Sequence, residues 1–219
     1  MARSKLIKDF INSQMSIDTA LQNLMSILYC LEDEALICWT KKELAGYNFN
    51  DELPAYRKIS GRVLGNFFVG YMKYTKHQIP INHLDEDIRK ALLEVPIYSS
   101  ISTLSSTVEK DSNLCKALSP EFYASLQRGS NANITSAYVD IDTTALTDII
   151  SKVKSKVLET LLFLEKEFGC LDNLDIDISS KNEVEIKSIV YQIQVNLYDN
   201  SISIGDNNKI KNSDILTNK

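Results

Sequence analysis

The residues best suited to chemistry lie between Glu43 and Arg57, where a carboxylate, two tyrosines and a guanidinium fall close together in the chain. The carboxylate could activate a water molecule, and the arginine could hold an anion through two parallel hydrogen bonds. The same residues suit a structural role, in which Glu43 pairs with Arg57 across a loop. The sequence favours the structural role and leaves a ligand site open. The candidate residues are Trp39, Glu43, Gly46, Tyr47, Pro54, Tyr56, Arg57 and Arg62.

Other patterns that could bind metals or do catalysis are weaker. The Glu-Asp-Glu run at residues 32–34 suits the start of a helix, with metal binding as the alternative. His77 and His83 flank Pro80 without further zinc ligands nearby, so we expect them to be exposed loop residues. The four cysteines lack Cys-x-x-Cys spacing, and no nucleophile elbow, phosphate loop or dinucleotide fingerprint is present. We therefore expect neither a metal nor a cofactor.

The composition predicts a folded protein that is neither secreted nor membrane-bound. Its 219 residues are 44% hydrophobic and 24% charged, which suits one main domain with a small appendage. The N-terminus carries charges where a signal peptide needs an apolar core, and no apolar run approaches the roughly 18 to 20 residues of a membrane span. We expect a cytoplasmic protein with no membrane association.

The net charge of −5 argues against a nucleic-acid partner, because no overall positive field attracts a phosphate backbone. A weak local signal leaves a nucleic-acid sensor open as an alternative. That signal is a sequence cluster of five cations, made of Lys41, Lys42, Arg57, Lys58 and Arg62.

The N-terminal third of the chain reads as helical. Between Leu6 and Ala45, apolar residues recur at spacings of three and four, which lines one helix face. Ser16 and Asp18 are plausible N-caps, and Asp33 could begin a second helix. Gly46 is the expected C-terminal cap.

The middle of the chain predicts a small hairpin followed by helices. The runs at residues 58–64 and 67–75 suit two strands joined by a turn at Gly65-Asn66. Asp85 suits the N-cap of a helix, and helical spacing continues over residues 97–116. The clearest helix spans Leu146 to Phe168, with Gly169 at its C-terminal cap.

The C-terminal segment predicts β structure. Apolar residues alternate with polar ones from Ile189 to Leu197, and Ile202, Ile204 and Ile210 continue the pattern. The predicted fold class is α+β, mainly α, with a helical main domain at residues 1–172 and a β tail at residues 173–219. Because such a tail exposes more apolar strand surface than a short hairpin hides, we expect it to form a homo-oligomer. The alternative is that its strands complete a sheet with the hairpin at residues 58–75 within one subunit.

Several motifs together resemble a known family. They are Trp39, Lys42-Glu43-Leu44-x-Gly46-Tyr47, Leu53-Pro54-x-Tyr56-Arg57, Ile79-Pro80-x-x-x-Leu84, Ile88-Arg89, Gly129-Ser130-Asn131, Ala137-Tyr138 and the helix from Val153 to Glu167. Over most of residues 5–170 the chain resembles the AbiTii domain of bacterial abortive-infection and antiphage defence proteins. Where family members carry Val-Arg in the last long helix, this chain has Val153-Lys154, which puts a role for guanidinium geometry there in doubt.

The resemblance implies a helical domain in a bacterial conflict system, with toxin or effector activity. The first hypothesis is a non-enzymatic interaction or effector protein that oligomerises through its tail and acts on a defence-system partner or a phage component. The alternatives are a hydrolase or nuclease-type toxin centred on Glu43 and Arg57, and a nucleic-acid sensor. The sequence leaves enzymatic activity open and favours its absence.

Overall fold

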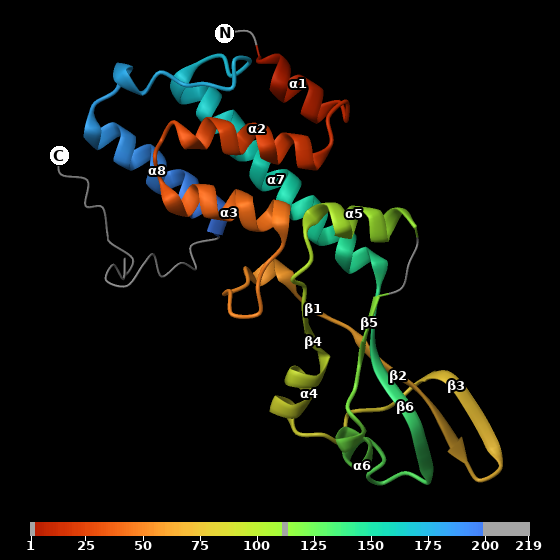
Figure 1. The fold of residues 1–219 in the computed structure, drawn as a ribbon. Helices are drawn as coiled ribbons and strands as arrows, with labels where there is room; N and C mark the ends of the chain where they lie inside the picture. Colours follow the sequence, from red (N-terminus) through yellow and green to blue (C-terminus); the bar gives the residue numbers. More distant parts are fainter. Residues whose placement is uncertain (1–2, 111–113, 199–219) are drawn as a thin grey trace. The chain divides into compact units, whose positions relative to one another are not determined.

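The computed structural model describes residues 3–110 and 114–198, which fold as a mixed α+β protein that is mainly α (Figure 1). The prediction of a mixed α+β fold that is mainly α is therefore confirmed. In chain order the elements are α1 (Lys5–Ile11), α2 (Ile17–Tyr29), α3 (Glu34–Ala45), η1 (Ala55–Arg57), β1 (Lys58–Ser60), β2 (Arg62–Val69), β3 (Met72–Gln78), α4 (Glu86–Leu93), β4 (Glu94–Pro96), α5 (Ile101–Glu109), β5 (Leu114–Ala117), η2 (Pro120–Phe122), α6 (Tyr123–Leu126), β6 (Ala132–Ile141), α7 (Thr143–Phe168), η3 (Ile178–Ser180) and α8 (Glu183–Tyr198).

Contacts divide the chain into two units. The first unit holds the described residues up to Ala45 and from Val153 onward, and the second unit is Gly46–Lys152. The second unit is thus an insertion into the first, and α7 crosses the boundary where the chain returns. None of the helices in the described residues has the length and apolar character needed to span a bilayer.

Side chains cap the starts of two helices of the first unit, α2 and α3. The Ser16 hydroxyl accepts a hydrogen bond from the Thr19 amide at 3.1 Å at the start of α2, as predicted. The Asp33 carboxylate accepts one from the Leu36 amide at 3.0 Å beside the start of α3, so the second helix begins next to Asp33, as the sequence suggested. The apolar faces of α2 and α3, together with that of α1, contribute to the core of this unit.

Helix α8 replaces the strand that was predicted from Ile189 to Leu197, so that prediction is wrong. Ile189, Ile193 and Leu197 are buried and recur every fourth residue. This spacing fits both the two-residue period of a strand and one face of a helix, and the helix is what forms. Tyr191, which a strand would place on the same face, is 41% exposed. The rest of the predicted β tail, including Ile202, Ile204 and Ile210, lies outside the described residues.

Polar side chains of α8 are also used inside the first unit. The Gln194 side-chain amide donates to both carboxylate oxygens of Asp33, at 3.2 and 3.1 Å. The buried Lys156 ammonium on α7 donates to the main-chain oxygen of Asn196 at 2.6 Å. Burial raises the pKa of the Tyr198 hydroxyl, which donates to the α3 main chain. Because buried polar groups need partners, these contacts fix how α8 packs on α3 and α7.

The second unit contains a four-stranded antiparallel sheet in the order β3-β2-β6-β5 and a two-stranded sheet of β1 and β4 (Figure 1). The predicted hairpin is present as β2 and β3, but its turn lies at Gly70-Tyr71. The predicted turn at Gly65-Asn66 is wrong, because both residues lie inside β2. A Cβ atom on Gly65 would lie 2.4 Å from the main-chain oxygen of Ser136, so the glycine allows β6 to approach.

Strand β6 was not predicted from the sequence. Its register opposite β2 steps from Ser136 to Ile134, which leaves Thr135 without an opposite residue. This bulge interrupts the alternation: Ile134 is buried, and the next buried residue is Ala137. A two-residue period is therefore visible only from Ala137 to Ile141.

The helix predicted over residues 97–116 is shorter than expected. Helix α5 occupies only Ile101–Glu109, and the predicted span overlaps strand β5. The Ser100 hydroxyl accepts a hydrogen bond from the Thr103 amide at 3.3 Å and starts the helix. The long helix predicted from Leu146 to Phe168 is confirmed as α7, and Gly169 follows it with φ +91°.

Substitutions on α8 will distinguish its helical packing from a strand. We expect Ile193→Ala to reduce the free energy of unfolding by about 2 to 5 kcal/mol, because it removes a buried side chain. We expect Tyr191→Ala to cost less than about 1 kcal/mol, because this residue is substantially exposed. Urea denaturation followed by far-UV circular dichroism measures both. Equal losses in the two variants would contradict the helix, since only a strand places both residues on one face.

Candidate functional site

The segment from Gly46 to Arg57, which contains most of the candidate residues, forms a tight corner at the start of the second unit. Gly46 follows α3 with φ +92°, as expected for a C-terminal cap. A Cβ atom on Gly46 would lie 2.8 Å from the main-chain oxygen of Tyr98, and the Tyr47 amide donates to the same oxygen at 2.8 Å. Only glycine combines this backbone conformation with so close an approach.

Arg57 lies at the centre of the corner and is 0% exposed. Its Nη1 atom donates to the main-chain oxygens of Ile97 at 3.4 Å and Ser99 at 2.5 Å. The guanidinium carbon lies 4.9 Å from the centroid of the Tyr47 ring, within the range of a cation–π contact. The main-chain oxygen of Arg57 accepts from the Ile97 amide at 2.9 Å. One residue therefore holds the segment at residues 97–99 from both its side chain and its backbone.

The remaining candidate residues of the motif are distributed over both units. Trp39 and Glu43 are 1% and 0% exposed on α3 of the first unit. In the second unit, Pro54 precedes η1, and its main-chain oxygen accepts from the Arg57 amide at 2.9 Å. Tyr56 is half-buried within η1. The ion pair between Glu43 and Arg57 stays a prediction.

The geometry of Arg57 suits a structural role better than anion binding. An arginine that grips a substrate needs guanidinium nitrogens directed at solvent or at a cavity. Here the guanidinium is enclosed, donates to main-chain oxygens and lies against an aromatic ring. Since a buried charge is costly without partners, these contacts account for the arginine without a ligand.

The five-cation cluster does not behave as one basic surface. Arg57 is buried, and the exposed Arg62 guanidinium lies 3.4 Å from the Asp140 carboxylate and 4.0 Å from that of Asp142. The ammonium of Lys41 lies 5.5 Å from the centroid of the Tyr29 ring. Three of the five cations, Lys41, Arg57 and Arg62, are therefore engaged by neighbours within their own unit.

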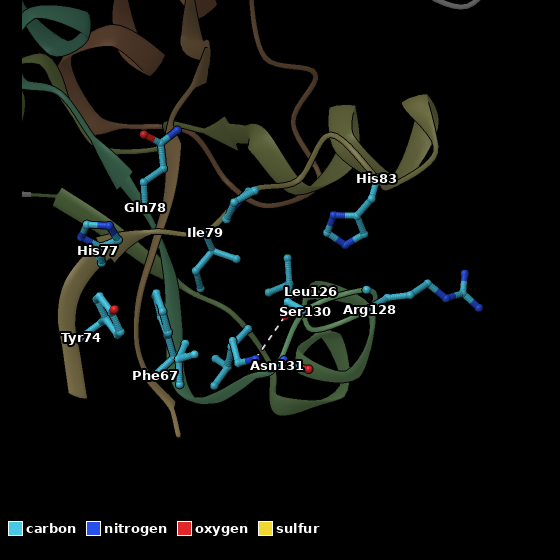
Figure 2. A pocket seen from close by; sticks show the side chains of 15 residues that line it. Phe67, Tyr74, His77, Gln78, Ile79, His83, Leu126, Arg128, Ser130 and Asn131 are labelled. Atoms are coloured by element: carbon cyan, nitrogen blue, oxygen red, sulfur yellow. Dashed lines mark hydrogen bonds between the residues drawn. The ribbon is translucent and has the colours of Figure 1, made fainter. Parts of the chain in front are cut away.

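A second candidate site is a pocket of about 710 Å³ in the second unit. This volume lies within the roughly 300 to 1,000 Å³ usual for small-molecule sites. Figure 2 shows the aromatic side chains at one end and His83 and Arg128 at the other, with Ile79 between them. The lining residues are Phe67, Val69, Tyr74, His77, Gln78, Ile79, Pro80, His83, Leu126, Arg128, Gly129, Ser130, Asn131, Ala132 and Ile134.

The aromatic end of the pocket is positioned by irregularities in the sheet. Opposite Asn66, β3 carries an extra residue, and Lys76 has φ +52° there. The Asn66 side chain accepts from the Lys76 amide at 2.9 Å and donates to the Ser136 hydroxyl at 2.8 Å. Asn66 thus supports the bulges on both neighbouring strands, and these bulges set which way Tyr74 and His77 point.

The opposite wall of the pocket is a turn that leads into β6. Gly129 adopts φ +76°, and the Ser130 hydroxyl donates to the Gln127 main-chain oxygen at 2.9 Å. The Gln127 side-chain oxygen accepts from the Ile134 amide at 2.5 Å. His83 Nε2 lies 3.0 Å from the Ser125 main-chain oxygen. These local contacts hold the polar rim in place.

Sequence reasoning missed this pocket. His83 is an exposed loop residue, as predicted, whereas His77 is exposed but lies on β3 rather than in a loop. The available signal was the pair of segments Ile79-Pro80 and Gly129-Ser130-Asn131, which were noted for the family resemblance and which both line the pocket. They meet only because β2 pairs with β6, and β6 was not predicted.

The carboxylate run at residues 32–34 serves the fold of the first unit. Asp33 accepts the hydrogen bond at the start of α3 and those of the Gln194 amide. Within the described part of the chain, no group of three or more His, Cys, Asp or Glu side chains is placed to hold a metal ion.

A comparison with protein-family models matches residues 4–191 to the AbiTii family. The chain belongs to the AbiTii family. Membership indicates an abortive-infection protein of antiviral defence. Searches of curated proteins and of solved structures found no significant match. The AbiTii match includes α1 to α3, the whole second unit, α7 and most of α8, so it covers both the corner and the pocket.

The corner of this AbiTii protein is open to a direct test with two glycines of nearly equal φ. Gly46 and Gly169 have φ +92° and +91°, but a Cβ atom would collide only at Gly46. We expect Gly169→Ala to cost about 1 to 2 kcal/mol through backbone strain alone. Gly46→Ala should cost at least about 1 kcal/mol more, because Tyr98 must also move. Urea denaturation compares them, and equal costs would refute the close packing at the corner.

Proposed function

We propose that this AbiTii protein is a non-enzymatic interaction or effector component of abortive-infection defence, acting in the bacterial cytoplasm. The observation that carries the proposal is the enclosure of Arg57. The hydrolase or nuclease alternative needs this guanidinium to reach a substrate anion, whereas the guanidinium is buried and contacts the Ile97 and Ser99 main-chain oxygens and the Tyr47 ring. The motif that distinguishes the chain therefore supports its fold.

A protein partner is part of this proposal. Apolar side chains gather at the turn between β2 and β3, where Tyr71 is 107% exposed and Met72 is 67% exposed. Phe68 and Val69 beside them are each 38% exposed. Clusters of exposed apolar residues often mark protein interaction surfaces. This turn supports contact with a defence-system partner protein or a phage component.

The role of Arg57 is tested by comparing stability with antiphage protection. We expect Arg57→Met to lose about 2 to 5 kcal/mol of unfolding free energy, because the main-chain oxygens of Ile97 and Ser99 lose a buried charged donor. Plaque assays should show lost protection at temperatures where the variant unfolds and retained protection at lower temperatures where it stays folded. Thermal melting of the purified protein locates these temperatures.

Arg62→Met is the matched control, because this arginine belongs to the same unit and its side chain is 61% exposed. It should melt close to the wild type and retain protection. A normal melting temperature together with lost protection in Arg57→Met would contradict the proposal and favour a catalytic site. Metal-dependent cleavage of DNA, RNA or nucleotides by the wild-type protein would also contradict it.

Self-association through the C-terminal tail is a further part of the proposal. The sequence support for self-association comes from Ile202, Ile204 and Ile210, because the segment before them packs as α8 within the first unit. The tail segment is therefore taken as residues 199–219. Removing more than this segment would delete α8 and expose the core of the first unit.

Light scattering on the full chain and on a chain ending at Tyr198 tests this role. We expect the full chain to be a homo-oligomer and the shortened chain to be a folded monomer, since the truncation keeps every buried residue of α8. Far-UV circular dichroism checks that the shortened chain is folded. A monomeric full chain at tens of micromolar would overturn the proposal, and so would a shortened chain that remains oligomeric.

A further inference from the structure

We infer that the pocket of the second unit binds a planar organic anion of the nucleoside monophosphate type. This inference goes beyond the proposed function, since it assigns a small-molecule site that neither the corner nor the tail requires. The pocket lies entirely within residues 67–134 of one unit, so its geometry is set by a single sheet and the turns that join it.

The charge of the lining selects an anion. The protein as a whole carries a net charge of −5, yet none of the fifteen lining residues is Asp or Glu. The rim instead carries the guanidinium of Arg128 and the imidazoles of His77 and His83. The Arg128 side chain is exposed and makes no ion pair with any residue that the structure describes. A guanidinium with free donors matches a phosphate in both charge and geometry.

The aromatic end of the pocket selects a flat body. Phe67 and Tyr74 stack with their ring centroids 5.0 Å apart and their planes 15° apart, and His77 lies 5.6 Å from Tyr74. Val69, Ile79 and Ile134 add apolar side chains to the lining. Bases stack readily on aromatic side chains, and such contacts occur where proteins bind unpaired nucleotides. The structure thus presents a ring-binding surface before any ligand arrives.

Neutral polar groups also line the pocket. Gln78, Ser130 and Asn131 lie along the lining and offer amide and hydroxyl groups of both donor and acceptor type. Figure 2 shows Ser130 and Asn131 beside Leu126, between the aromatic end and the Arg128 end. A ligand with a ring, a sugar and a phosphate meets an apolar wall, polar side chains and a cation in that order. A single base-bearing phosphate fits this sequence, whereas inorganic phosphate alone leaves the aromatic wall uncovered.

Isothermal titration calorimetry on the full-length protein tests the inference. The probes are the 5′-monophosphates of adenosine, guanosine, cytidine and uridine, with adenosine and inorganic phosphate as separate arms. We expect at least one monophosphate to bind at least tenfold more tightly than either fragment, because only the complete ligand uses both ends of the pocket. Arg128→Gln should weaken that binding about tenfold or more, because it removes a charged hydrogen bond.

Two further variants make the result specific. Tyr74→Leu should weaken the monophosphate by about fivefold or more through lost stacking. Arg62→Gln, which removes an exposed arginine outside the pocket, should bind as the wild type does. Thermal melting confirms that each variant is folded.

Several results would overturn the inference. They are the absence of binding by all four monophosphates at millimolar concentration, equal binding of adenosine or phosphate, and equal weakening by Arg62→Gln. Chromatography of the nucleotide recovered after binding shows whether it is intact or converted, and this distinguishes failure of the inference from failure of the proposed function. Intact nucleotide agrees with both, whereas conversion of a bound nucleotide would overturn the non-enzymatic proposal and leave the binding site in place.

Discussion

A permanent positive charge in the interior of the second unit is the constraint on which much of that unit depends. Arginine stays protonated under all ordinary conditions, so a buried guanidinium must be surrounded by acceptors or lose stability. These acceptors include the main-chain oxygens of residues 97 and 99, which follow β4 directly. Satisfying Arg57 therefore fixes the path of the chain from β4 to the N-cap of α5 at Ser100. Lysine would not be equivalent, because it lacks the planar guanidinium whose carbon lies 4.9 Å from the centroid of the Tyr47 ring.

The candidate ligand site depends on a different feature, which is the pair of β-bulges in the four-stranded sheet. In a regular strand, Tyr74 and His77, which are three residues apart on β3, would point to opposite faces of the sheet. The extra residues on β3 and β6 change this direction locally, and Asn66 satisfies the backbone and side-chain groups around both bulges. In both places, polar contacts fix the positions of the surrounding backbone and side chains. At the corner these contacts enclose a charge, whereas at the pocket they leave charged side chains on the rim.

The sequence predicted those elements whose signals are local and strong. Helix α7 has a long apolar stripe, and Gly46 and Gly169 mark helix ends through their own conformational freedom. Helix α8 was mistaken for a strand because Ile189, Ile193 and Leu197 fit both periods, and only contacts with α3 and α7 decide between them. Strand β6 was missed because its bulge at Thr135 breaks the alternation. The pocket could not be predicted without the pairing of β2 with β6, which joins segments far apart in the chain. The sequence identified the segment from Glu43 to Arg57 as one motif. The burial of Arg57 was needed to favour a structural role over a catalytic one.

The order in which the two units are completed during synthesis follows from the insertion of one into the other. Helices α1 to α3 leave the ribosome first, but their partners on α7 and α8 come more than a hundred residues later, as the bonds of Ser4 with Glu165 and of Asp33 with Gln194 illustrate. The inserted unit has all of its own sequence by Lys152. Translation at roughly 5 to 20 residues per second gives it several seconds to fold ahead of its host. The unit that contains the chain's first residues is thus the last to be completed, and a message cut short after the insertion yields a finished sheet attached to helices without partners.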